Sequence, residues 1–198
     1  YKQALFPVVQ DPQFFVADIF RFTVGWLIAG YAVRQVWRRE FAVLALAVLV
    51  TVVLVGRIIV VGKTLVTPEL AGLALAAGVG ALLIAAPDRR RCTILAALLA
   101  AVVIIEGLKP FAFSGQMQVF SWVPFKSSLA SSLEINYSIL LEKCFWYFAL
   151  VWLLARRGYG AGVAALMVMV LLALIEIAQL WIPGRSAEIT DPLLALVL

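Results

Sequence analysis

The sequence contains no histidine and few charged residues. Lys, Arg, Asp and Glu make up 14% of the 198 residues, whereas 65% of the residues are hydrophobic. In soluble domains roughly a quarter of the residues are charged. This composition therefore excludes a soluble domain and indicates an integral membrane protein. Without histidine the chain lacks the commonest general base and metal ligand. We therefore expect a protein that is not an enzyme, with no catalytic residue, no metal site and no cofactor.

Cysteine is also scarce, and the cations do not form a nucleic-acid patch. Cys92 and Cys144 lie in or beside different apolar runs, where we interpret them as packing residues. The net charge of +5 comes from short clusters of Lys and Arg between apolar runs. Clusters in such positions are typical of the residues that set the orientation of a membrane protein. We expect no nucleic-acid partner. The expected partners are membrane lipids or, alternatively, other membrane protein subunits.

The apolar runs are long and continuous, which predicts membrane-spanning helices rather than a barrel. Several reach the roughly 20 residues that cross a bilayer core. The fold class is therefore an all-α polytopic transmembrane bundle of about six to seven helices. The chain starts without Met and stops inside an apolar run, so we expect it to be part of a longer protein. The predicted spans are 14–33, 41–61, 68–86, 92–108, 136–155 and 161–182, with a seventh beginning near 192.

The loops between the predicted spans alternate in charge. Three of them hold the arginine clusters, which are Arg34, Arg38 and Arg39, then Arg89, Arg90 and Arg91, then Arg156 and Arg157. Because cytoplasmic loops are enriched in cations, these loops are predicted to lie in the cytoplasm. The "GKT" turn (62–64), the 109–134 loop and the "PGRSAEITD" turn (183–191) then face outward. The 109–134 loop is rich in Phe, Trp and Ser, and we expect it at the membrane interface as a re-entrant, amphipathic or ordinary loop.

Two of the outward turns resemble each other. Residues 62–64 (Gly, Lys, Thr) match residues 184–186 (Gly, Arg, Ser) at an offset of 122 (184 − 62), and Glu69 matches Asp191. The same offset superimposes the predicted spans 14–33 and 136–155. We predict a parallel internal repeat, with a degenerate first copy at 1–91 and a second, C-terminally truncated copy at 92–198.

The second copy carries a distinctive polar motif at the end of its span. In "IEIAQLWIPGRSAEITD", Glu176 and Gln179 are three residues apart, Pro-Gly-Arg follows, and Asp191 comes six residues after Arg185. This pattern, with "WVPF" (122–125) upstream, resembles the VanZ-like family of bacterial membrane proteins over about residues 92–198. The resemblance implies a multi-pass protein of the bacterial inner membrane. It also implies a link to antibiotic resistance, because the family's namesake is associated with resistance to the glycopeptide teicoplanin.

Ionisable side chains within predicted spans are costly and mark candidate functional sites. Glu176 and Gln179 share a helix face, and we hypothesise that they line an outward-facing polar vestibule with Arg185 and Asp191 at its rim. An arginine there suits a phosphate or carboxylate group. The alternative is that such charges pair internally, as Asp18 with Arg21 or Arg185 with Asp191. The candidate ligand-binding residues are Glu176, Gln179, Arg185, Asp191 and, in the first copy, Lys63 and Glu69.

Three functions are compatible with these residues. The first is a non-catalytic envelope protein that binds or shields a lipid-linked or anionic envelope component at the outer face. The second is an accessory subunit of a larger membrane complex, docked through the charged turns. The third is an enzyme acting on a lipid phosphate, which is disfavoured because no nucleophile–base pair is visible in the spacing.

Overall fold

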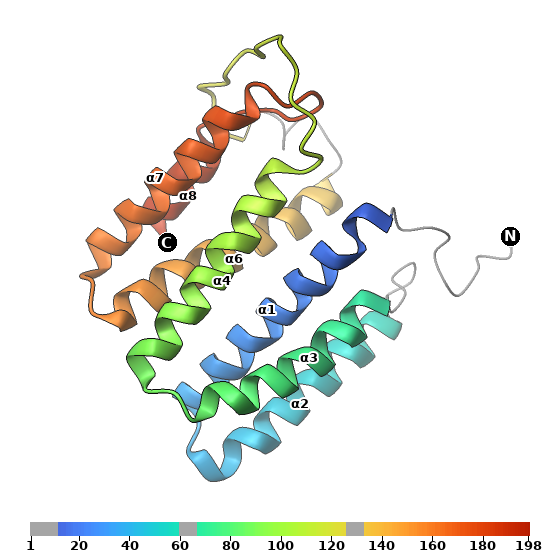
Figure 1. Cartoon of the computed structure of the whole chain (residues 1–198), viewed down its shortest axis with the longest axis vertical. Helices are drawn as coiled ribbons and strands as arrows, with labels where there is room; N and C mark the ends of the chain where they lie inside the picture. Colours follow the sequence, from blue (N-terminus) through green and yellow to red (C-terminus); the bar gives the residue numbers. More distant parts are fainter. Residues whose placement is uncertain (1–11, 60–66, 126–132) are drawn as a thin grey trace, which may run out of the picture. The chain divides into compact units, whose positions relative to one another are not determined.

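The computed structural model of the chain describes residues 12–59, 67–125 and 133–198, and all regular structure in these ranges is helical (Figure 1). The described ranges contain no strand, and one isolated bridge joins Ser121 to Glu188. The all-helical prediction is confirmed. The helices are α1 (Pro12–Val36), α2 (Arg39–Ile59), α3 (Thr67–Ile84), α4 (Asp88–Leu108), α6 (Leu133–Arg157), α7 (Ala161–Gln179) and α8 (Thr190–Val197).

These helices follow the predicted spans to within a few residues at most ends. Four of them are long and apolar enough to cross a membrane, namely Phe14–Val36, Thr67–Ile84, Asp88–Leu108 and Ala161–Gln179. Helix α2 contains a shorter apolar stretch, Glu40–Gly56. The chain is thus a multi-pass helical membrane protein, while the number of six to seven spans stays a prediction.

Helix ends coincide with residues that favour initiation or termination. Pro68 stands in the first turn of α3 and Asp88 in the first turn of α4, where a missing N–H and a negative charge are both well tolerated. Helix α6 ends in Arg156 and Arg157, which complement the negative end of the helix dipole. Short loops join α3 to α4 and α6 to α7, and arginines stand at the helix ends beside both loops.

The chain divides into two compact units, Tyr1–Ala86 and Pro87–Leu198. In the first unit, α1 packs mainly against α3 and less extensively against α2. The contact between α1 and α3 is close at Gly72, where an added Cβ would lie 2.6 Å from Phe22 Cβ and 2.9 Å from the Thr23 nitrogen. Only a glycine allows the two backbones to approach this closely.

In the second unit, α4, α6 and α7 pack against one another, and α8 packs mainly on α7. The core lies between the helices, where Leu99 of α4, Leu153 of α6 and Val168 of α7 are almost fully buried. The opposite face of α7 exposes Leu166, Val170 and other large apolar side chains at helical spacing, including Val163, Leu174 and Ile177. A helix that is apolar all round fits a bilayer, where lipid replaces water on the outer face.

The internal repeat stays a prediction. Shifted by 122 residues, α1 would cover 134–158 and α2 would cover 161–181, close to the observed limits of α6 and α7. The packing does not follow the same offset. Helix α3 packs on α1, whereas its counterpart α8 packs mainly on α7. The two units separate at Ala86 and Pro87, and the expected repeat boundary at residue 91 falls inside α4.

Candidate functional site

Most of the polar motif of the sequence forms a turn between α7 and α8, which we call the motif turn (residues 180–191). Gly184 has a φ of 78°, a left-handed conformation that glycine adopts without strain. The Arg185 N–H donates to the Ile182 carbonyl at 3.3 Å and closes the bend. Pro183 and Gly184 therefore account for the turn itself, and the charged residues require a separate explanation.

Arg185 and Gln179 bind the carboxyl end of α4. The Arg185 guanidinium donates from Nε to the Lys109 carbonyl and from Nη2 to the Glu106 carbonyl, both at 2.8 Å. Gln179 Nε2 donates to the Gly107 carbonyl at 2.9 Å. The last carbonyls of a helix have no partner within the helix, and a cation there also complements its dipole. The motif turn is thus fixed to the end of α4.

Glu176 connects α7 to the far side of the same turn. Its Oε2 accepts the Glu188 backbone N–H at 2.7 Å, and Glu176 is buried. The Glu188 side chain is also buried and accepts a hydrogen bond from the Thr190 hydroxyl at 3.2 Å. Thr190 Oγ1 in turn accepts the Phe125 N–H at 2.8 Å. One carboxylate near the end of α7 thereby orders the turn that follows.

Asp191 binds α6. Its two carboxylate oxygens accept hydrogen bonds from Lys143 Nζ at 2.7 and 2.8 Å, and Oδ2 also accepts the Tyr147 hydroxyl at 2.7 Å. Lys143 and Tyr147 lie four residues apart on one face of α6, so both reach the same carboxylate. Asp191 is buried, and this charge-assisted pair holds the start of α8 against α6.

These groups surround a polar cavity of about 200 Å³, which we call the motif cavity. Its lining consists of Lys143, Glu176, Gln179, Gly184, Arg185, Ser186, Glu188, Thr190 and Asp191. Every fully buried side-chain nitrogen or oxygen in the described part of the chain has a hydrogen-bond partner. The second oxygen of Glu176 has no hydrogen-bond partner among the described residues, so it is not fully buried, and Glu176 lines the cavity.

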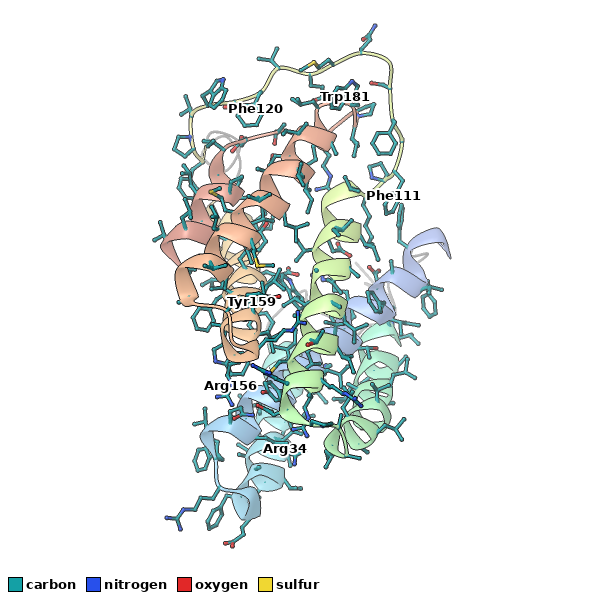
Figure 2. The ribbon with its side chains drawn as sticks, turned by 60° about the vertical axis from the view of Figure 1, so that its left-hand side comes forward. Arg34, Phe111, Phe120, Arg156, Tyr159 and Trp181 are labelled. Atoms are coloured by element: carbon teal, nitrogen blue, oxygen red, sulfur yellow. The ribbon has the colours of Figure 1, made fainter. Side chains whose placement is uncertain are left out.

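An aromatic segment (residues 111–125) lies along the motif turn. Its backbone N–H groups at Ser114, Gln118 and Ser121 donate to the carbonyls of Trp181, Leu180 and Ala187 at 2.7 to 2.9 Å. Figure 2 shows the segment as an arch beyond the ends of α4 and α7, with Phe111 and Phe120 on the arch and Trp181 of the motif turn beside it. Several of its large apolar side chains, among them Phe113 and Trp122, are exposed, as expected for an interfacial loop.

The structure brings four of the six candidate residues together. Glu176, Gln179, Arg185 and Asp191 all line the motif cavity. Glu69 lies in the first turn of α3 in the first unit, where it is buried, and Lys63 lies outside the described residues. The hypothesised pair of Arg185 with Asp191 is replaced by other partners, because Arg185 binds carbonyl groups and Asp191 binds Lys143.

Lys143, Tyr147, Ser186, Glu188 and Thr190 belong to the site but were not among the candidates. Lys143 was recognisable as an ionisable residue inside a predicted span, and Tyr147 follows it at helical spacing. Nothing local in the sequence pairs Lys143 or Tyr147 with Asp191, which lies 48 residues after Lys143 and 44 residues after Tyr147. As for metals, no three His, Cys, Asp or Glu side chains gather as ligands in the parts of the chain described above.

The fold and the site define a class of protein. It is a multi-pass helical membrane protein with a cluster of buried and half-buried polar and ionisable side chains at one end of its second unit. The model of the VanZ/LLP1 family matches residues 92–197, which is more than half of the chain and includes the whole motif turn. The chain therefore belongs to the VanZ/LLP1 family. No curated protein and no solved structure matches it.

Proposed function

We propose that the chain is a non-catalytic membrane protein of the bacterial cell envelope that binds the polar headgroup of a lipid-linked or anionic envelope component. The observation that supports this is the motif cavity, where four motif residues and their partners surround a polar space next to apolar helices. Charged groups at membrane depth are costly and are kept where they bind something or bind one another. The cavity leaves room for a ligand beside the internal bonds.

The size of the cavity limits the ligand. About 200 Å³ is below the roughly 300–1,000 Å³ of pockets that enclose drug-sized molecules. A whole glycopeptide antibiotic does not fit, whereas a phosphate with a few hydroxyl groups does. A role in resistance would then consist of shielding a lipid-linked target rather than holding the drug.

The lining favours a headgroup that carries both hydroxyl and phosphate groups. Arg185 has five N–H donors, of which two bind α4, and Ser186 is exposed beside it. These groups suit phosphate oxygens. The open oxygen of Glu176 repels a bare anion but accepts hydrogen bonds from hydroxyl groups. A glycerol phosphate or sugar phosphate headgroup offers phosphate oxygens to Arg185 and Ser186 and hydroxyl groups to Glu176.

A soluble headgroup tests this proposal. We expect glycerol 1-phosphate to raise the thermal unfolding temperature of the purified full chain, and inorganic phosphate to do so less. Ser186→Phe places a ring in the mouth of the cavity and should abolish the shift. Gln116→Phe adds the same ring to an exposed position of the aromatic segment, outside the cavity lining, and should leave the shift unchanged. Equal shifts in all three proteins would contradict the proposal.

We further propose that the protein lies in the bacterial inner membrane with the motif turn outside the cytoplasm. The distribution of arginine in the loops and the exposed aromatic side chains of residues 111–125 support this orientation. The alternative function, an accessory subunit of a larger membrane complex, predicts a stable association with other chains. Mass measurement after extraction in mild detergent separates the two, because a monomer without partners argues against the subunit.

A further inference from the structure

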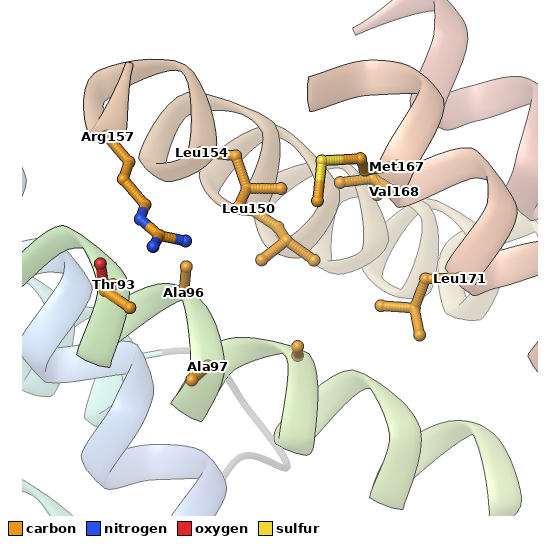
Figure 3. Close-up of a pocket in the computed structure, with 10 residues that line it drawn as sticks. Thr93, Ala96, Ala97, Leu150, Leu154, Arg157, Met167, Val168 and Leu171 are labelled. Atoms are coloured by element: carbon orange, nitrogen blue, oxygen red, sulfur yellow. The ribbon is translucent and has the colours of Figure 1, made fainter. Parts of the chain in front are cut away.

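A second cavity, of about 320 Å³, lies at the other end of the second unit, and its lining is almost entirely apolar. Figure 3 shows it between α4, α6 and α7. The α4 side is formed by the small side chains of Ala96, Ala97 and Ala100, and the facing helices contribute Leu150, Leu154 and Leu171. We call this space the alanine groove. It lies near the start of α4, whereas the motif turn binds the end of that helix.

The shape and chemistry of the groove favour a hydrocarbon chain over a polypeptide. A helix with side chains is about 10 Å across and does not fit a space of this size. An extended peptide would bring unsatisfied N–H and C=O groups against alkyl side chains, which is costly in a membrane. The hydroxyl of Thr93, one of the few polar groups there, already donates to the Arg89 carbonyl at 2.9 Å.

The mouth of the groove is positively charged. Arg157 lines it, and its Nη1 donates to the Tyr159 hydroxyl at 3.3 Å. Arg89 lies close by, because its Nη2 is 3.6 Å from the position that a Cβ on Gly158 would occupy. The nearby carboxylate of Asp88 pairs instead with Arg91 at 3.9 Å and Arg156 at 3.5 Å. Within the described residues, neither Arg89 nor Arg157 has a carboxylate partner.

We propose that the alanine groove binds one anionic phospholipid, with an acyl chain along the alanines of α4 and the phosphate on Arg89 and Arg157. Basic pockets between transmembrane helices commonly bind anionic headgroups, and arginine binds phosphate through paired N–H groups. The acyl chain contributes packing in a space that the helices leave open. This site is separate from the motif cavity and does not depend on the function proposed for it.

Lipid retention measured by native mass spectrometry tests the proposal. The full chain is purified and supplied with phosphatidylglycerol or phosphatidylcholine of identical acyl chains. We expect one phosphatidylglycerol per chain to be retained in preference to phosphatidylcholine. The double variant Arg89→Gln with Arg157→Gln should weaken this retention by roughly tenfold to thirtyfold. Arg90→Gln changes an exposed arginine beside Arg89 in the first turn of α4 and should change the retention little.

A second variant tests the acyl-chain part of the site. Ala97→Phe fills the groove and should remove phosphatidylglycerol, whereas Ala47→Phe at an exposed position of α2 should not. Ser186→Phe in the motif cavity should leave phosphatidylglycerol retention unchanged. The proposal for the alanine groove can therefore be contradicted independently of the proposal for the motif cavity. Equal retention of both lipids, or full retention in Ala97→Phe, overturns the proposal. A dimer that Ala97→Phe disrupts also overturns it, because a second copy then covers the groove.

Discussion

At the scale of single residues, Arg185 explains why a tight turn in an apolar chain carries a cation. Its guanidinium binds the Glu106 and Lys109 carbonyls at the end of α4. Carbonyls at a helix end near the bilayer have little access to water, so an unsatisfied group there is costly. The planar geometry of arginine lets one side chain satisfy two carbonyls at once.

Arg185→Lys should therefore destabilise the second unit although it keeps the charge. A lysine ammonium cannot reproduce the paired geometry of Nε and Nη2, and the loss of one charged hydrogen bond costs about 1–3 kcal/mol. The measurement is the unfolding temperature in detergent. Arg90→Lys changes the same residue type at an exposed position and serves as the control. If both variants unfold at the wild-type temperature, Arg185 does not stabilise the end of α4.

At the scale of secondary-structure elements, helices pack closely where small residues remove side-chain bulk. Helix α3 approaches α1 at Gly72, while Gly78 on the same helix has no atom within 4 Å of an added Cβ. In a bilayer, helix association depends on such packing because burial from water is already complete. Two glycines of one helix thus have different roles.

Gly72→Ala should destabilise the first unit by about 1–3 kcal/mol, since the added methyl group overlaps the backbone of α1. Gly78→Ala should be neutral or stabilising by up to about 1 kcal/mol, because alanine favours the helix and meets nothing. Thermal unfolding of the two variants compares the positions directly. Equal effects would mean that α1 and α3 do not pack closely at Gly72.

At the scale of the whole molecule, the second unit has two chemically different ends. The end of α4 and α7 carries the motif cavity and the aromatic segment, and the other end carries the arginines at the start of α4 and the end of α6. The exposed apolar faces of the helices lie between these ends. This distribution matches a bilayer with an interfacial belt on one side and cations on the other.

Cysteine labelling measures the orientation. In a chain with Cys92 and Cys144 replaced by alanine, Gln116→Cys should react with a membrane-impermeant maleimide in intact cells. Arg90→Cys should react only after lysis if, as proposed, the arginine-rich ends of α4 and α6 face the cytoplasm. Both positions are exposed on the protein surface, so accessibility depends on the membrane alone. The reverse pattern would contradict the proposed topology.

The sequence predicted the helices well but not their packing. Long apolar runs set the limits of α1, α4 and α7, because a spanning helix needs a nearly unbroken apolar stretch. The same uniformity conceals which face packs inward. Leu166 and Val168 of α7 are equally apolar, yet the first is exposed and the second is buried.

The site was predictable only where its residues lie close together in the sequence. Glu176, Gln179, Arg185 and Asp191 were grouped by helical spacing and by the turn, and they line one cavity. Their partners were beyond local spacing. Arg185 binds main-chain carbonyls 76 and 79 residues away, and no side-chain pattern marks a carbonyl that every residue carries.

The bonds of the motif turn have a consequence for the order of synthesis. Lys143 emerges from the ribosome 48 residues before Asp191, and the α4 carbonyls emerge still earlier relative to Arg185. Chains generally fold as they are made, from the N-terminus onward. We therefore expect α4 and α6 to be inserted before their partners in the motif turn have been made, and the motif turn completes these bonds later.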